Sequence, residues 1–296
     1  MRKIQWSRYA LLLTLIIGFS VSNNLHWGKD HWNQVLKVDA RGYNAHLPAI
    51  FIYQDLQFNF FEELEMKTYF NPNVTYEYRT VTEYGTVNRY FCGTAILQTP
   101  FFLVARIWAH FGNYPDDGYS RPFPLMITIA GLFYLLLGLY FLNRLLQNWN
   151  IEEWVRAIVI LLLAFGTHLF NYSIVDPGMS HVYSFAMISM FLAAAQKAFS
   201  TGQLWYWPAM AAILAIICLI RPVNGIVAFA LPLLSSDPNI FLSRLKEFFQ
   251  SRGVLLLSIL LFLSIISIQG FIYQIQTGHW LINSYQDEGF NWLDPH

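Results

Sequence analysis

The first stretch of the sequence that could carry out chemistry spans residues 38–56 and reads VDARGYNAHLPAIFIYQDL. Its leading carboxylate, Asp39, follows the first apolar run and lies beside an expected membrane boundary. A carboxylate in that position can act as a general base on a hydroxyl group. The alternative is a solvated loop acid paired with Arg41. The residues after Asp39 indicate a shaped turn into a helix, which makes Arg41 and Tyr43 candidates for binding substrate.

A second polar cluster, IVDPGMSHVYSF at residues 174–185, lies where two apolar runs meet. A helix cap would account for Asp176 or Ser180. Ionisable residues near membrane depth nevertheless indicate a functional site. Asp176 is therefore a candidate, and His181 could bind phosphate or sugar hydroxyl groups.

A third cluster, LIRPVNGI at residues 219–226, places an arginine between two apolar runs. Such an arginine is costly unless it finds a partner or water. Arg221 could reach out to lipid headgroups. It could instead neutralise a lipid-linked phosphate, with Asn224 adding a hydrogen bond.

A fourth cluster lies near the end of the chain, where residues 278–292 read GHWLINSYQDEGFNW. Gln286, Asp287 and Glu288 stand among aromatic residues, a combination that suits sugar recognition and equally suits an interfacial loop. The sequence has no metal-ligand spacing, phosphate-binding glycine loop or Ser/His/Asp order, so it predicts no metal-binding residue.

The composition determines what kind of element must position these residues. The 296 residues are 55% hydrophobic and only 12% charged, whereas a soluble domain is roughly a quarter charged. This deficit predicts a polytopic membrane protein. The net charge of zero argues against nucleic acid as a partner. The two cysteines do not indicate a disulfide framework, because Cys218 lies inside an apolar run.

We expect an all-α fold, a polytopic transmembrane helical bundle with a long first extracytoplasmic loop that contains interfacial amphipathic helices. Residues 1–22 form the first transmembrane helix, retained instead of being cleaved as a signal peptide. Residues 23–121 form the loop, residues 122–273 the bundle, and residues 274–296 a second extracytoplasmic loop. The uncharged runs of the bundle are Pro122–Asn143, Ala157–Val175, Pro177–Gln196, Ala198–Ile220, Val223–Leu234 and Val254–Tyr273.

The positive-inside rule decides which polar groups meet. We expect Cys92–Ala109 not to cross the membrane, and Arg221-Pro222 to form the tip of a tight hairpin. The short basic loops then lie in the cytoplasm with the N-terminus. Asp39, Asp176, His181, Arg221 and the tail lie together on the extracytoplasmic side.

These stretches together resemble the GT-C superfamily of membrane glycosyltransferases, in particular its protein-mannosyltransferase and aminoarabinose-transferase-like branch. The stretches that carry the resemblance are VDARGYNAHLPAIFIYQDL, GTAILQTPFFLVARIWA, DPGMSHVYSF, RPVNG and TGHWLINSYQDEGFNW. Each motif alone is weak, whereas their order and their placement relative to the apolar runs are more specific.

The resemblance implies an inverting hexosyl- or pentosyltransferase of the plasma (inner) membrane with an extracytoplasmic active site. The donor would be a polyprenyl-phosphate-linked sugar, and the acceptor a lipid, glycan or protein hydroxyl. Asp39 would be the general base, Arg221 would stabilise the leaving phosphate, and Asp176 would lie near the site. A divalent cation is left open.

The sequence also departs from this pattern. The region TVNRYFCGTAILQTP lacks the Pro-Pro pair of many relatives, and Glu83 is its nearest acid. Relatives usually have more spans and a C-terminal domain, so we expect the chain to be incomplete or a short member. Two other readings stay open, a lipid-linked-sugar transporter or flippase and a non-catalytic membrane subunit.

Overall fold

The computed structural model describes residues 5–72, 75–235 and 237–285. This part of the chain is mostly helical, as predicted. A helix of about 20 residues spans the roughly 30 Å hydrocarbon core of a bilayer. Four of the described helices are long and apolar enough to do so: α1 (Trp6–His26), α5 (Pro122–Asn148), α7 (Ser180–Thr201) and α10 (Arg252–Thr277).

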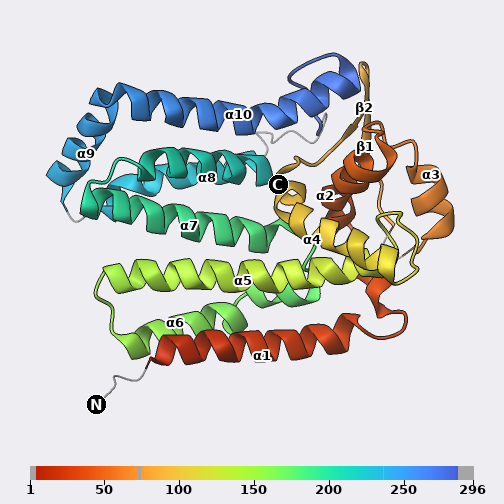
Figure 1. Ribbon diagram of the computed structural model, residues 1–296, viewed down its shortest axis with the longest axis horizontal. Helices are drawn as coiled ribbons and strands as arrows, with labels where there is room; N and C mark the ends of the chain where they lie inside the picture. The colour runs from red at the N-terminus through yellow and green to blue at the C-terminus, as the bar shows by residue number, and fades with distance from the viewer. Residues whose placement is uncertain (1–4, 73–74, 236, 286–296) are drawn as a thin grey trace, which may run out of the picture.

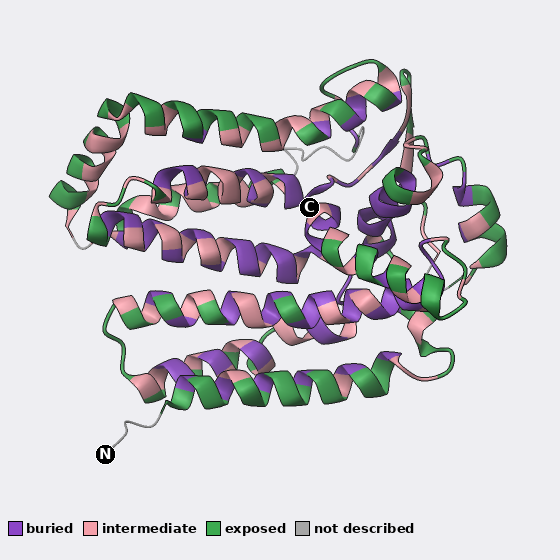
Figure 2. Ribbon diagram, viewed as in Figure 1, coloured by how far each residue is buried: buried purple, intermediate pink, exposed green. Residues whose placement is uncertain are grey.

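The long helices lie side by side, with α5 and α7 in the middle and α1 and α10 at the two margins (Figure 1). The core between α5 and α7 contains Tyr134 and Tyr183, whose ring centroids are 5.0 Å apart. Many apolar side chains of α10 are exposed, so this helix carries green segments along its length in Figure 2, with pink and a few purple ones between them. Exposed apolar surface of this kind is typical of a helix that faces lipid.

Two of the predicted runs are divided differently in the structure. The run at 157–175 contains α6 (Glu153–Gly166), followed by the π-helical turn η4 (Asn171–Val175). The run at 198–220 contains the end of α7 and then α8 (Tyr206–Ile220). The break follows Thr201 because Gly202 adopts the left-handed conformation, with φ of 70°, which ends a helix.

The expected turn at Arg221-Pro222 is present. Helix α8 ends at Ile220, and the 3-10 helix η5 (Pro222–Leu234) packs back against α8 and α7. Helix α9 (Pro238–Gln250) then leads into α10.

The segment between α1 and α5 folds into an end subdomain, which we define as residues 27–121. Phe58, Phe61 and Tyr78 pack edge to face in its aromatic core, with centroids 5.4 to 5.6 Å apart. Its regular elements are η1 (His31–Gln34), α2 (Asp39–Pro48), η2 (Ala49–Tyr53), α3 (Phe61–Glu63), η3 (Leu64–Thr68), β1 (Arg79–Thr82), β2 (Gly85–Asn88) and α4 (Gly93–Phe111).

This subdomain has two features that the sequence did not predict. Every residue of α2 after Asp39 is buried, as the purple ribbon in Figure 2 shows. A β-hairpin was also not expected: β1 pairs with β2 in antiparallel register, with Arg79 opposite Asn88. The β-branched residues of TVTEYGTVN favour strands. Helix α4 is absent from the four candidate spans and lies obliquely at the end of α5 (Figure 1).

The two ends of the bundle differ in charge. The end subdomain occupies one end, whereas the start of α1, the α5–α6 turn and α9 lie at the other (Figure 1). The basic residues at or next to the second end are Arg8, Arg144, Arg156, Lys197, Arg244, Lys246 and Arg252. We call the second end the basic end.

Candidate functional site

A cavity of about 450 Å³ lies where the start of α2, the segment between β2 and α4, and the end of α8 come together. We call it the Asp39 cavity. Its polar lining combines a carboxylate, guanidinium groups and phenols. The residues with these groups are Asp39, Tyr43, Tyr76, Arg89, Tyr90, Arg221 and Tyr285.

Asp39 is the first residue of α2 and presents its carboxylate to this cavity. Its Oδ1 accepts a hydrogen bond of 2.7 Å from the hydroxyl of Tyr90. Among the described residues no side chain donates to Oδ2. The preceding residue, Val38, has φ of 51° and ψ of −131°, a strained backbone for a β-branched residue. Strain of this kind is often found at functional sites.

Tyr90 is held against α2 by the absence of a side chain at Gly42. A Cβ at that position would lie 2.2 Å from Tyr90 Cδ2. The Tyr90 ring also packs against Tyr43, with centroids 4.7 Å apart. Burial, and then the hydrogen bond to Asp39, raise the pKa of Tyr90 above its ordinary value. Tyr90 is therefore a neutral phenol that donates to the carboxylate.

Arg221 reaches the cavity because α8 ends immediately before it. Pro222 disfavours a helical conformation in the residue that precedes it, and Arg221 is extended, with φ of −153° and ψ of 120°. Its Nε donates to Ser180 Oγ at 2.9 Å and its Nη2 to Tyr43 Oη at 3.3 Å. The guanidinium is thus oriented by α7 and α2 together.

The end of α8 is positioned by a close backbone contact with α4. A Cβ on Gly93 would lie 2.3 Å from the backbone nitrogen of Ile220, the residue before Arg221. Only glycine permits this approach without displacing α8. The cavity is therefore lined by a carboxylate and a guanidinium from distant parts of the chain. The carboxylate can accept a proton from a substrate, and the guanidinium can stabilise negative charge that develops on it.

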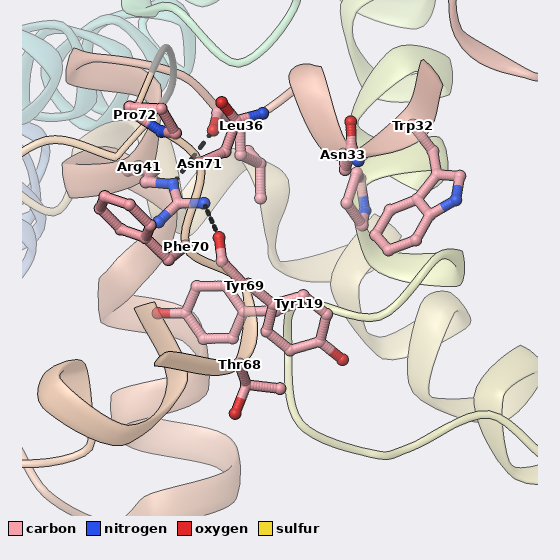
Figure 3. A pocket seen from close by; sticks show the side chains of 11 residues that line it. Trp32, Asn33, Leu36, Arg41, Thr68, Tyr69, Phe70, Asn71, Pro72 and Tyr119 are labelled. Carbon is pink, nitrogen blue, oxygen red and sulfur yellow. Dashed lines mark hydrogen bonds between the residues drawn. The ribbon is translucent and has the colours of Figure 1, made fainter. Parts of the chain in front are cut away.

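Arg41 is engaged elsewhere. It is buried and donates to Glu65 Oε2 at 3.0 Å and to the carbonyl oxygens of Leu36 and Tyr69, each at 3.3 Å. The two carbonyl bonds are the dashed lines in Figure 3, which shows a separate cavity of about 250 Å³. Glu65 is fully buried and also accepts from Tyr78 and Tyr119. Arg41 thus neutralises a buried carboxylate in the end subdomain.

The other candidates surround the cavity without lining it. Asp176 forms an ion pair of 2.6 Å with Lys37, close to the start of α2, and does not cap α7. His181 stacks on Tyr172 with centroids 3.8 Å apart, within electrostatic range of Asp39 and Arg221.

Asn224 donates to Ser184 Oγ at 2.9 Å and so ties η5 to α7. Glu83, the acid nearest to the missing Pro-Pro pair, is exposed in the turn between β1 and β2. Both residues lie outside the lining of the Asp39 cavity.

Gln286, Asp287 and Glu288 lie outside the described residues. The described tail before them does return to the site, because Ser284 Oγ donates to the carbonyl of Arg89 at 3.0 Å. Tyr285 lines the cavity, and burial raises its pKa to about 12.

Sequence reasoning missed four polar residues of the lining, Tyr76, Arg89, Tyr90 and Tyr285. A signal was present for three of them. Tyr285 lies inside TGHWLINSYQDEGFNW, a stretch that carries the family resemblance, and Arg89 and Tyr90 lie in the region TVNRYFCGTAILQTP. Their position opposite Asp39 depends on the hairpin, which was not expected.

In the described ranges no group of three or more His, Cys, Asp or Glu residues could hold a metal ion. Comparison with protein-family models, with curated proteins and with solved structures finds no match.

Proposed function

We propose that the chain is a membrane glycosyltransferase of GT-C type, which moves a sugar from a polyprenyl-phosphate donor to an acceptor hydroxyl in the Asp39 cavity. The observation that carries the proposal is that Asp39 and Arg221 line the same cavity. They are separated by most of the chain, and two different helices, α2 and α8, bring them together.

In the proposed reaction Asp39 accepts the proton of the acceptor hydroxyl. The acceptor oxygen forms a bond to the anomeric carbon as the bond from that carbon to the phosphate oxygen breaks. The lipid phosphate leaves with the electron pair, and the configuration inverts. Arg221 stabilises the charge that develops on the phosphate, the type of electrostatic term that usually contributes most to catalysis.

The surface beside Arg221 suits a lipid-linked donor. Val223, Ile226 and Phe229 are exposed and recur every third residue along η5, the spacing that aligns side chains on one face of a 3-10 helix. An apolar stripe on η5 therefore begins two residues after Arg221. A polyprenyl chain along this stripe would keep its phosphate beside Arg221.

The proposed orientation has the basic end in the cytoplasm and the Asp39 cavity outside. The positive-inside rule supports it, because basic residues gather in the turns of the basic end. The end subdomain also carries Lys and Arg residues, but long loops are translocated largely regardless of charge.

The test is transfer of radiolabelled sugar by the protein in nanodiscs. Each polyprenyl-phosphate hexose or pentose of a panel is supplied with membrane lipid, glycan and protein fractions as acceptors. We expect transfer from at least one donor, and a loss of about 10²–10⁴ in rate for Asp39→Asn, because a positioned base contributes that much. Donor binding should remain.

Glu83→Gln is the matched control, since it removes an exposed carboxylate of the same subdomain outside the cavity. Transfer at the wild-type rate by Asp39→Asn would overturn the mechanism. Movement of the donor across the bilayer without sugar transfer would favour the transporter instead.

A further inference from the structure

A second hollow, at the basic end of the bundle, is separate from the Asp39 cavity. It has a volume of about 380 Å³ and lies among α5, α7 and α8. Small side chains leave this space open between the helices. The apolar residues that line it are Phe141, Met190, Ala193, Ala194, Ala209 and Ile213.

Two basic residues line the same hollow, Arg144 near the end of α5 and Lys197 near the end of α7. The guanidinium of Arg144 donates to the side-chain amide of Gln147 at 3.3 Å, which leaves its charge uncompensated. No Asp or Glu lines the hollow. Among the described residues neither cation has an acidic partner within 4 Å.

Some cations at the basic end do have a carboxylate partner. Arg156 is paired with Glu153 and Arg244 with Glu247. The two cations that border the apolar hollow have none within the described part of the chain, and no acidic side chain lines the hollow with them. An anionic occupant would supply the missing charge.

Aromatic residues mark the level of the hollow in the bilayer. Trp205 is exposed and stacks on Tyr206 with centroids 3.9 Å apart, and both line the hollow. Trp and Tyr are enriched at the membrane–water interface. The hollow therefore combines an interfacial rim, two free positive charges and an apolar floor.

We propose that this hollow binds an anionic glycerophospholipid from the leaflet at the basic end. Its phosphate lies between Arg144 and Lys197, and an acyl chain lies against the alanines of α7 and α8. Basic pockets between transmembrane helices on the cytoplasmic side bind anionic headgroups in this way. A zwitterionic headgroup would bring its own ammonium group towards the two cations. The inference does not depend on sugar transfer.

The experiment uses quenching of Trp205 by brominated lipid. The full chain is placed in phosphatidylcholine nanodiscs that contain the same minor fraction of brominated phosphatidylglycerol or brominated phosphatidylcholine. The fluorescence quenched at Trp205 is obtained as the difference in quenching between the wild type and Trp205→Phe. We expect phosphatidylglycerol to associate at least about fivefold more strongly, since one basic residue near anionic headgroups contributes about that factor.

The double variant Arg144→Gln/Lys197→Gln should reduce this preference towards one. The matched control, Lys246→Gln/Arg252→Gln, removes the same charge from α9 and α10 at the same end and should keep it. Thermal melting of both variants verifies folding. Equal quenching by the two lipids in the wild type would overturn the proposal. An equal loss in both double variants would overturn it as well, because it would indicate diffuse surface attraction.

Discussion

Tyr90 donates its phenolic hydrogen to Asp39 Oδ1 across 2.7 Å, and the two residues are 51 positions apart in the chain. This bond orients one oxygen of a carboxylate that lines the cavity, while no side chain among the described residues donates to the other oxygen. A hydrogen bond to a charged group contributes about 1.5–3 kcal/mol.

Tyr90→Phe should therefore lower the rate of sugar transfer by roughly tenfold to a hundredfold, which is the kinetic equivalent of that energy. Donor binding, measured by titration of the same nanodiscs, should change little. Tyr84→Phe is the control, because Tyr84 is an exposed phenol in the hairpin turn. Wild-type transfer by Tyr90→Phe would show that this hydrogen bond does not orient the base.

Gly93→Ala should destabilise the protein and displace Arg221. The new Cβ would lie 2.3 Å from the Ile220 nitrogen, and backbone cannot yield as a flexible side chain can. Overpacking of this kind costs about 1–3 kcal/mol, measurable as a lower midpoint of thermal unfolding in detergent. Gly253→Ala is the control, because a Cβ there would meet nothing within 4 Å. It should be neutral or stabilising, since alanine favours a helix. Equal effects at the two positions would contradict the argument.

Arg41→Met should destabilise the end subdomain by about 3–5 kcal/mol, because it leaves the buried Glu65 carboxylate without its cation. Arg106→Met is the matched control. Arg106 also pairs with a carboxylate, Asp116, but both groups are partly exposed, and such pairs contribute about 0–1 kcal/mol. Chemical unfolding followed by tryptophan fluorescence measures both. A small effect for Arg41→Met, together with weakened donor binding, would instead assign Arg41 to the substrate.

His46 should make stability depend on pH. Burial lowers the pKa of His46 to about 4 in the folded protein, although its hydrogen bond to the Tyr90 carbonyl opposes the shift. The unfolded chain has a His pKa of about 6.5. Between these values the unfolded state binds more protons, so stability is complete above about pH 6.5 and declines as the pH falls to about 4.

The decline attributable to His46 should reach about 3 kcal/mol, at about 1.4 kcal/mol for each pKa unit. The free energy of unfolding, measured between about pH 4 and 6.5, should depend less steeply on pH in His46→Gln than in the wild type. His279→Gln is the control because that ring is exposed. A slope unchanged by His46→Gln would show that His46 is not the group responsible.

The helical bundle was predictable because long uncharged runs are typical of membrane-spanning helices. The points at which these runs break into separate helices were harder to predict. The break at Gly202 depends on one left-handed residue inside an apolar stretch, and hydropathy alone does not detect it. The turn at Arg221-Pro222 was predictable, because proline restricts the preceding residue and arginine is unfavourable inside a span.

The Asp39 cavity was predictable in part. Charge asymmetry placed Asp39 and Arg221 at the same end, and both line the cavity together with Tyr43. Their catalytic and binding roles remain predictions. The sequence could not show that Arg41 and Arg221 have different roles. Arg41 pairs with the buried carboxylate of Glu65, 24 positions later, and a local motif does not reveal such a contact. Tyr90 was missed because its contact with Asp39 depends on the tertiary fold.

The tail at Tyr285 makes occupancy of the cavity measurable without knowledge of the sugar. Tyr285 forms part of the cavity wall, whereas Trp280 and Leu281, between it and α10, are exposed. Chymotrypsin prefers such residues, so we expect it to cleave this connection before the helices of the bundle. A ligand that holds Tyr285 in place would slow the cut. The rate of proteolysis at this link can thus screen donor lipids directly.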